Sequence, residues 1–299
     1  MMNMTGSQTI EVIKELTGHS GCSVQLCLRG DRYFVRKISS SPSYNIRLKR
    51  QADKQVALSR FIPTPEVYIV GEIGELAYFD MEYVRGHGFI SFAPLQSVKG
   101  ICDIVESLCA SISSLAATRT QDLEAVFFAR KLDELARTVP ASPFFAAHES
   151  FLDQTIDTLR HKPWKGVPKT FCHGDLTVEN MMLKDNGGIV FIDMLDGELE
   201  SVWLDIAKLL QDLHSGWSLR SLLWAQEPAP SDRLLRTLTR YLADEIETQM
   251  ARNLPQFAIL SHDLRALQAL RVLPYVKDAV TFQHVVSGLK ELTIMKEFA

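Results

Sequence analysis

The chain has 299 residues, of which 46% are hydrophobic and 23% charged, and its formal net charge is −4 at pH 7. This length suits two lobes or one large domain, and the composition is ordinary for a soluble globular enzyme. The acidic balance argues against nucleic acid as a partner, because nucleic-acid-binding proteins gather basic side chains on one face. No apolar run is long enough to cross a bilayer, so we expect no membrane insertion.

The five cysteines are odd in number and form no CxxC pair, so the sequence suggests neither a zinc site nor a disulfide framework. This usage is typical of a reducing compartment, and the first ten residues lack the apolar core of a signal peptide. We therefore expect the protein in the cytoplasm. Nothing in the pattern specifies an oligomeric state.

Residues 1–84 are predicted to form a small lobe built mainly from strands. A glycine-bearing turn at residues 18–21 would be able to lie over phosphates with its backbone N–H groups, although most such turns only reverse the chain. Residues 29–32 read as a hairpin turn. Strands are predicted at residues 23–28, 33–38, 67–70 and 76–84, and helices at 9–16 and 45–61.

Arg36 and Lys37 stand near the end of the second predicted strand. Successive side chains of a strand point to opposite faces, so one of the two must face the covered side of the sheet. A buried cation needs a partner, which nucleotide phosphates would supply. We favour Lys37 as the inward residue. The helix that follows offers no glutamate to pair with it, only Asp53 between two glutamines.

Residues 85–299 are predicted to form a larger, mostly helical lobe, so the expected fold class is α+β. Ser231 and Ser261 are expected as N-caps, because short hydroxyl side chains satisfy free N–H groups at helix starts. Helices are predicted at residues 95–117, 121–138, 146–161, 204–213, 232–253, 262–272 and 274–297.

A stretch inside the helical half carries the chemistry. Residues 171–180 read Phe-Cys-His-Gly-Asp-Leu-Thr-Val-Glu-Asn, and a second apolar run ends at Asp193. A lone aspartate before a loop is usually a turn former. Asp175, Asn180 and Asp193 in combination suit phosphoryl transfer, in which one aspartate meets the acceptor hydroxyl while an amide and a carboxylate hold Mg²⁺. His173 is expected to be structural.

This stretch resembles the signature of the aminoglycoside phosphotransferase/choline kinase-like family, small-molecule relatives of the protein kinase fold. His173-Gly174-Asp175 with Asn180 matches the family's catalytic loop, and residues 192–196 resemble its metal-binding segment. Residues 203–207 resemble the start of the next helix, whose aspartate braces the catalytic loop. The resemblance implies a two-lobed protein kinase-like fold, with a small antiparallel-sheet lobe and a larger helical lobe.

The resemblance also implies roles for individual residues. Asp175 would be the catalytic base, Asn180 and Asp193 the Mg²⁺ ligands, and Lys37 a phosphate contact. The strand exit would be a hinge whose backbone holds the purine of ATP or GTP; its residues are Glu82, Tyr83 and Val84.

The implied activity is transfer of the γ-phosphate of ATP or GTP to a hydroxyl of a small acceptor. The sequence at residues 175–180 and 214–217 also resembles that of family members found with surface-polysaccharide biosynthesis. This resemblance favours a sugar or sugar-like precursor as the acceptor. An aminoglycoside, choline or another amino alcohol is the alternative acceptor. Acidic side chains would attract such an amine, unless they are solvated or paired with Lys208 and Arg220; they are Asp196, Glu198, Glu200 and Asp212. Trp203, Trp217 and Trp224 would stack on a sugar, although tryptophan more often lies in the core.

Two other function classes compete with the kinase. A nucleotide-binding regulator or pseudokinase without turnover is favoured by the missing glutamate, but the intact Asp175, Asn180 and Asp193 argue against it. Metal-assisted hydrolysis would need a denser set of His and Asp ligands than this chain shows.

Overall fold

The computed structural model describes residues 9–16, 22–184, 188–223 and 229–297, which divide into two compact units. The first unit contains the described residues up to Gly86 and also Val190–Asp196, and the second contains the rest. The expected boundary after residue 84 assigns Val190–Asp196 to the second lobe. In the structure this segment packs with the first unit, where the Phe191 N–H donates to the Pro63 carbonyl at 2.9 Å.

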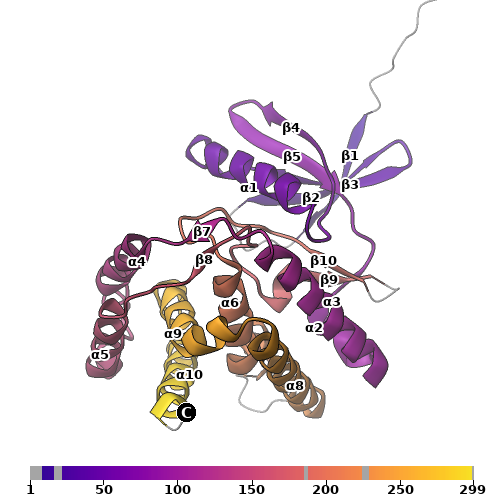
Figure 1. The fold of residues 1–299 in the computed structure, drawn as a ribbon. Coiled ribbons are helices and arrows are strands. Elements are labelled where there is room, and N and C mark those ends of the chain that lie inside the picture. Colours follow the sequence, from indigo (N-terminus) through magenta and orange to yellow (C-terminus); the bar gives the residue numbers. More distant parts are fainter. Residues whose placement is uncertain (1–8, 17–21, 185–187, 224–228, 298–299) are drawn as a thin grey trace, which may run out of the picture. The chain divides into compact units, whose positions relative to one another are not determined.

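The first unit is a five-stranded antiparallel sheet in the order β1-β2-β3-β5-β4 (Figure 1). Gly30 and Gly74 adopt positive φ angles of 64° and 60° in the two hairpin turns, a conformation that glycine reaches without a steric penalty. The strands are β1 Ile10–Leu16, β2 Ser23–Arg29, β3 Arg32–Ile38, β4 Val67–Ile73 and β5 Leu76–Glu82.

Helix α1 (Asn45–Leu58) packs against β5 (Figure 1). Its Leu48 and Ala52 form a buried cluster with Ala77 and Phe79 of the strand. Burial of this apolar surface, at roughly 25 cal/mol per Å², fixes the helix to one face of the sheet. That face is therefore the covered side on which an inward cation of β3 would lie.

The second unit is mainly helical, which together with the antiparallel sheet confirms the predicted α+β class. Short strands also occur in it, with β6 (His87–Gly88) paired to β9 (Met181–Leu183) and β7 (Gln121–Asp122) paired to β8 (Pro168–Lys169). Strand β10 (Ile189–Phe191) leads the chain back into the first unit. The helices are α2 Phe89–Phe92, α3 Val98–Ala116, α4 Ala125–Thr138, α5 Glu149–Arg160, α6 Val202–Ser215, α7 Arg220–Leu223, α8 Pro230–Asn253, α9 Pro255–Val272 and α10 Ala279–Glu297.

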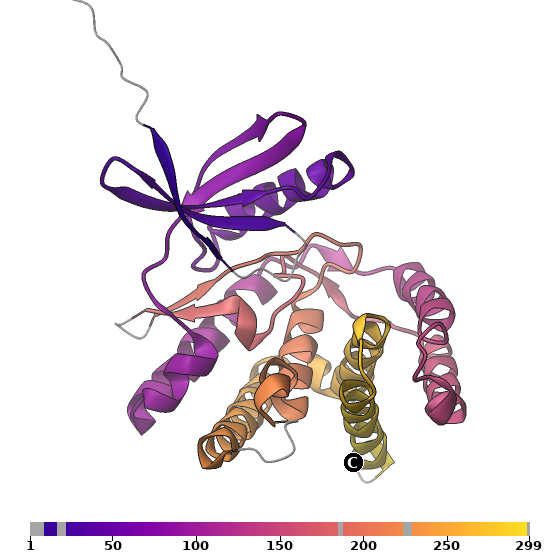
Figure 2. The same cartoon turned by 180° about the vertical axis from the view of Figure 1, so that it is seen from behind.

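Helix α6 is the central element of the second unit. It packs against both α8 and α9, and Figures 1 and 2 show it between them. The Ser201 side chain caps its start by accepting from the Trp203 N–H at 3.2 Å, and Gly216 ends it with a positive φ of 71°. All residues from Val202 to Leu213 are buried, polar ones included. Polar side chains on so buried a helix must have partners within the protein.

Three local expectations from the sequence are wrong. The helix predicted at residues 121–138 begins only at Ala125, because Gln121–Asp122 is a strand paired with β8. Residues 9–16 do not form a helix, because Ile10–Leu16 is a strand that pairs with β2 along its whole length. Neither Ser231 nor Ser261 caps a helix, because prolines start both helices earlier: α8 begins at Pro230 and α9 at Pro255. Ser261 lies within α9 and is buried. The turn predicted at residues 18–21 lies outside the described residues.

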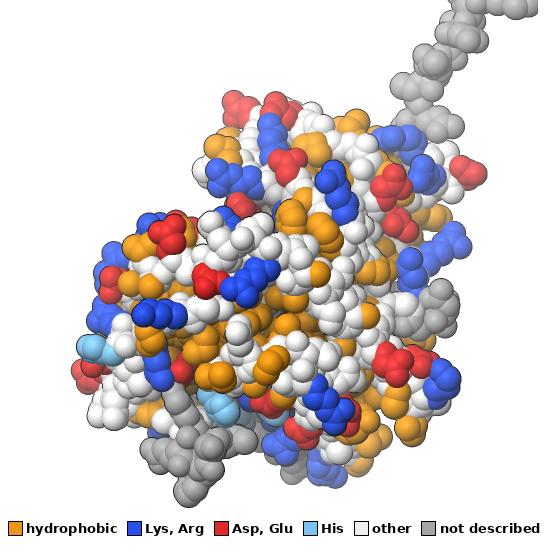
Figure 3. All heavy atoms as spheres, viewed as in Figure 1, with side chains coloured by type: hydrophobic (Ala, Val, Ile, Leu, Met, Phe, Trp, Pro, Cys, Tyr) orange, Lys and Arg blue, Asp and Glu red, His pale blue; other side chains and the backbone are white. Residues whose placement is uncertain are grey.

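Surface charge on the face shown in Figure 3 is mixed, with Lys and Arg interspersed among Asp and Glu. Within the described ranges, no helix has the length and apolar character that a bilayer crossing requires.

Candidate active site

The loop at residues 171–180 is held by hydrogen bonds from its backbone to Asp205 on α6. The His173 N–H donates to Asp205 Oδ2 at 2.5 Å, and the Gly174 N–H donates to Oδ1 at 2.8 Å. Asp205 is only 2% exposed, so both bonds lie in a dry environment where a charged acceptor is strong. The bracing role expected for this aspartate is therefore present in the structure.

The turn that presents Asp175 depends on its two preceding residues. Gly174 has a φ of +93°, a conformation that a side chain would strain. His173 is fully buried, and its Nδ1 accepts from the Asp175 N–H at 3.3 Å. This placement agrees with a structural role for the imidazole. The Asp175 side chain is 39% exposed and can therefore meet a ligand from solution.

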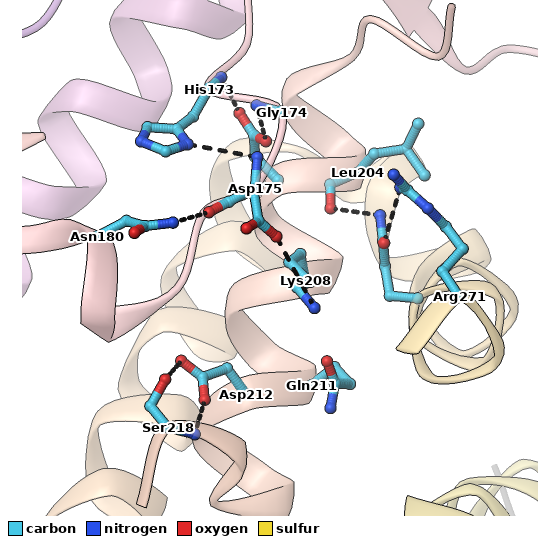
Figure 4. A network of polar contacts seen from close by, with 12 residues as sticks. His173, Gly174, Asp175, Asn180, Leu204, Lys208, Gln211, Asp212, Ser218 and Arg271 are labelled. Carbon is cyan, nitrogen blue, oxygen red and sulfur yellow. Dashed lines mark hydrogen bonds and ion pairs between the residues drawn. The ribbon is translucent and has the colours of Figure 1, made fainter. Parts of the chain in front are cut away.

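Asn180 is oriented by the same loop. Its Nδ2 donates to the Asp175 carbonyl at 2.8 Å (Figure 4). The amide nitrogen is thus engaged inside the loop, and the amide oxygen is the atom directed to a ligand. An oxygen is the donor that Mg²⁺ takes.

Two further residues of α6 support the loop. Lys208 Nζ lies 3.9 Å from Asp175 Oδ1, which places a buried cation beside that carboxylate (Figure 4). Burial lowers the pKa of the Lys208 ammonium, while the charges of Asp175 and Asp212 oppose that shift. Asp212 accepts from the Val178 N–H at 2.9 Å and from the backbone and side chain of Ser218, both at 2.7 Å. Burial raises the pKa of Asp212 against these hydrogen bonds.

In the first unit, the sheet register decides which cation of β3 faces α1. Lys37 pairs with Phe79 of β5, and directly opposed residues of an antiparallel pair share a face. Phe79 packs on α1, so Lys37 lies on the covered side, as favoured from the sequence. Arg36 points to the other face, where its Nε and Nη2 donate to Asp80 at 2.7 and 2.8 Å. This bidentate bond raises the pKa of the Arg36 guanidinium.

The partner of Lys37 is Asp193. Lys37 is 2% exposed, and its Nζ lies 2.5 Å from Asp193 Oδ1. Asp53, the acid that the sequence offered on α1, lies on the exposed side of that helix. The missing glutamate therefore does not leave the buried lysine uncompensated.

Asp193 has a left-handed backbone, with a φ of +61°, which aspartate tolerates better than most residues. The chain after it is tied to α1 of the same unit. Lys54 Nζ donates to the Leu195 carbonyl at 2.6 Å, and Arg50 lies 3.7 Å from Asp196. These contacts hold Asp193 in place while 34% of its side chain stays exposed.

The predicted hinge begins at the end of β5. The Glu82 N–H donates to the Glu66 carbonyl at 2.8 Å, so this N–H is already used. Val84 is buried, and the Tyr83 ring lies 6.1 Å from that of Tyr33. A purine at this segment would therefore not pair with the Glu82 N–H.

Each unit thus holds part of the predicted set. The second brings Asp175 and Asn180 onto one loop, and the first brings Lys37 and Asp193 into an ion pair. The sequence analysis missed the contact of Lys208 with Asp175 and the loop-holding role of Asp212. Their spacing from Asp205, three and seven positions on, was the available signal, since such residues share a helix face.

Most of the side chains proposed to attract an amine have other partners. Asp212 is buried in the hydrogen bonds above, Asp196 lies near Arg50, and Glu198 pairs with Arg130 at 2.5 Å. The two cations proposed as their partners bind elsewhere: Arg220 pairs with Glu179 at 3.1 Å and Lys208 with Asp175.

The tryptophans that were proposed to stack on a sugar have different surroundings. Trp203 is 4% exposed and packs edge-on against Phe257, so it belongs to the core. The Trp217 ring stacks under the Arg220 guanidinium at 4.6 Å. Trp224 lies outside the described residues.

The donor atoms that each unit offers are of the kind that binds Mg²⁺. Asp193 offers a partly exposed carboxylate and Asn180 an amide oxygen, both hard ligands. Among the described residues no three His, Cys, Asp or Glu side chains gather closely enough to hold a metal by themselves. In sites for Mg²⁺–nucleotide, phosphate oxygens complete the coordination of the ion.

Comparison with known proteins gives one family and one fold. A family model described as a phosphotransferase enzyme family matches residues 17–223. No curated protein matches the chain. The predicted resemblance to the aminoglycoside phosphotransferases is thereby confirmed.

Solved structures share the fold at low sequence identity. A putative fructosamine-3-kinase from Haemophilus somnus 129PT is 15% identical, with 94% of this chain and 92% of that chain covered and a TM-score of 0.59. A thermostable mutant of aminoglycoside phosphotransferase APH(4)-Ia is 12% identical, with coverage of 96% and 93% and a TM-score of 0.65. A glucosamine kinase is 16% identical, with coverage of 98% and 84% and a TM-score of 0.60. These similarities confirm the two-lobed, kinase-like fold.

Proposed function

The chain belongs to the phosphotransferase enzyme family, and on that premise we propose that it transfers the γ-phosphate of ATP or GTP to a hydroxyl of a small, sugar-like acceptor. The observation that carries the proposal is the loop in which Asp205 holds the backbone on which Asp175 and Asn180 are presented. Phosphoryl transfer asks mainly for such positioning, together with neutralisation of phosphate charge.

Asp175 is the base in this proposal. Its carboxylate orients the acceptor hydroxyl and takes up the proton as the hydroxyl oxygen bonds to the γ-phosphorus. The bond between that phosphorus and the β–γ bridging oxygen breaks, and the nucleoside diphosphate leaves with the bonding electrons. Lys208 Nζ, 3.9 Å from Asp175 Oδ1, keeps the carboxylate of the base oriented.

Lys37, Asn180 and Asp193 serve the nucleotide. Lys37 would contact phosphate oxygens, and Asn180 and Asp193 would supply oxygen ligands to Mg²⁺. The ion, when bound, neutralises charge on the phosphates. Backbone groups from Glu82 to Val84 would hold the purine. Two similar structures support a nucleotide co-substrate: one contains ADP with hygromycin B, and the other ADP with glucosamine and inorganic phosphate.

A sugar-like acceptor is supported by the same neighbours, which are named for fructosamine, glucosamine and an aminoglycoside. The narrower assignment of the acceptor to a precursor of surface polysaccharide rests on the sequence of residues 175–180 and 214–217 and stays a prediction. The regulator alternative loses its main support, because Lys37 has Asp193 as its counter-ion.

The test is acceptor-dependent turnover. Wild-type protein and Asp175→Asn are incubated with Mg²⁺, ATP or GTP and a panel of sugars, amino alcohols and aminoglycosides, and release of nucleoside diphosphate is measured. Loss of a positioned base predicts a fall in kcat of about 10²–10⁴-fold in the variant. Nucleotide affinity, measured by calorimetry, should be unchanged.

Two results would contradict the proposal. One is full acceptor-dependent turnover by Asp175→Asn, which would remove the base from the mechanism. The other is nucleotide binding without turnover by the wild type across the whole panel, which would favour a regulator.

A further inference from the structure

The helical unit contains an open pocket of about 770 Å³ among α6, α8, α9 and α10. This volume falls within the range of about 300–1,000 Å³ that small-molecule sites occupy. The mechanism above makes no use of it. All of its lining residues belong to the unit that carries Asp175.

The described lining of the pocket is rich in cations. Three arginines follow one face of α8 and a fourth comes from α9, against the two carboxylates Asp244 and Glu291. Positions three and seven apart on a helix share a face, which explains why the α8 arginines converge. The four arginines are Arg233, Arg236, Arg240 and Arg265.

Three polar atoms of the lining are buried without a hydrogen-bond partner: Arg265 Nε, Gln211 Oε1 and His214 Nε2, the last of which lies 3.5 Å from Glu247 Oε2. Arg265 is 4% exposed, and its Nε has no acceptor, although its Nη1 donates to Glu247 at 3.1 Å. Gln211 is also 4% exposed, and its Oε1 has no donor. Buried polar groups are normally paired, so unpaired ones in the wall of a pocket point to a ligand that supplies the partner.

The arginines are also crowded. Burial and the neighbouring Arg240 lower the pKa of Arg236 to about 10, while Arg236 itself donates to the carbonyls of Leu213 and His214. Burial, followed by the charge of Arg236, lowers the pKa of His284. An anion in the pocket would relieve this repulsion, and a cation would add to it.

Helix α6 connects the pocket to the catalytic loop. Lys208 contacts Asp175, and Gln211, one turn further along the helix, lines the pocket (Figure 4). Residues three apart lie on the same helix face, so the face that meets Asp175 continues into the pocket wall. The rise from Lys208 to Gln211 is about 5 Å along the helix, so the pocket wall begins one helical turn from the residue that contacts Asp175.

We propose that this pocket binds an anionic group, a phosphate or a carboxylate, of the acceptor whose hydroxyl meets Asp175. The inference rests on the proposed function and narrows it to an acidic acceptor. Guanidinium groups suit both anions because they bind them through paired N–H donors. A cationic amino alcohol would meet like charge in the same place.

Binding without nucleotide tests the pocket separately from catalysis. Calorimetry on the full chain compares glucose 6-phosphate and glucuronate with glucose and glucosamine, and inorganic phosphate serves as the minimal probe. The key variant is Arg233→Gln with Arg240→Gln, since both side chains are exposed and their loss should leave the fold intact. Arg252→Gln is the matched control, because Arg252 is exposed on the same helix and does not line the pocket.

We expect the anionic probes to bind wild-type protein about tenfold more tightly than glucose or glucosamine, and the double variant to lose about tenfold of their affinity. The control should behave as wild type. Inorganic phosphate should protect the wild type, but not the double variant, against thermal unfolding. Tighter binding of glucose 6-phosphate than of glucuronate would identify phosphate, rather than carboxylate, as the anion that the pocket prefers.

Either of two outcomes overturns the inference: neutral or cationic sugars that bind as well as the anionic ones, or anion binding that the double variant retains in full. Failure of the proposed function is distinguishable, because it would appear as absent turnover with every acceptor, whatever the nucleotide-free binding shows.

Discussion

Lys37 Nζ lies 2.5 Å from Asp193 Oδ1, an ion pair between residues that are 156 positions apart in the chain. The lysine is buried and the aspartate only partly so. The pair joins strand β3 to the segment that follows β10, and it fixes two of the three side chains proposed to serve the nucleotide.

Replacing Lys37 by Met should weaken binding of nucleotide with Mg²⁺ by about 10–100-fold, the range for loss of one charge-assisted hydrogen bond. Calorimetry with a non-hydrolysable ATP analogue measures the change. Lys49→Met is the control, because Lys49 is exposed and pairs with the exposed Glu72. Equal affinity in Lys37→Met and wild type would show that Lys37 makes no phosphate contact.

Lys208→Met should lower kcat by about tenfold at pH 7, because one lost interaction of about 1.4 kcal/mol with the base has that effect. Burial lowers the pKa of Lys208 from its ordinary 10.5. The positive charge beside Asp175 is thus present below the lowered pKa and lost as pH rises through it. The wild type should therefore lose activity on the alkaline side before pH 10.5, and Lys208→Arg should shift this loss to higher pH. An identical alkaline limb in both proteins would exclude Lys208 as its cause.

Asp205→Asn should destabilise the protein by roughly 1.5–3 kcal/mol, since one of the two N–H groups of His173 and Gly174 would lose its acceptor and the other would keep only a neutral one. Denaturant unfolding measures the free energy. Because the loop positions the base, kcat should fall more than KM rises. A variant that is destabilised but has an unchanged kcat would show that Asp205 acts on the fold alone.

Glu247 should contribute to stability with a defined pH dependence. The contact with His214, whose Nε2 lies 3.5 Å from Glu247 Oε2, followed by the charge of Arg265, lowers the pKa of Glu247 from 4.5 against the effect of burial. Its contribution is therefore present above pH 4.5 and lost as pH falls through the lower folded-state value.

Glu247→Gln should cost about 1 kcal/mol at pH 7, since the side chain is partly solvent-screened. The difference from wild type should shrink in acid, as thermal melts between pH 3 and 7 would measure. Glu134→Gln, which breaks the partly exposed pair with Lys131, is the control and should change little. A constant difference at every pH would contradict the assignment.

Local patterns were sufficient to predict much of the fold. The hairpin between β2 and β3 followed from alternation around Gly30, and α1 from helical spacing. Strand β1 was missed because most of its side chains are exposed, so no buried face produced an alternation of period two. Helix α9 was predicted to start late because it is buried on several sides, with Asp263 and Arg265 inside, and shows no single apolar stripe.

The candidate site could be predicted where its residues lie close in sequence. Asp175 and Asn180 share one loop, so their spacing carried the information. The partner of Lys37 could not be read this way, because the contact with Asp193 depends on how distant segments fold together. The arginine-lined pocket is similar, since its walls come from four helices whose lining residues span residues 211–292.

Helix α6 has one more consequence for the loop at residues 171–180. Its residues 205, 208 and 212 meet loop residues in the same order, through His173 and Gly174, then Asp175, then Val178. The loop is thus held along its length by hydrogen bonds and an ion pair to one buried helix. Its amide hydrogens at 173, 174 and 178 should exchange with deuterium together, at the slow rate set by opening of α6, while the neighbouring surface turns exchange independently and fast.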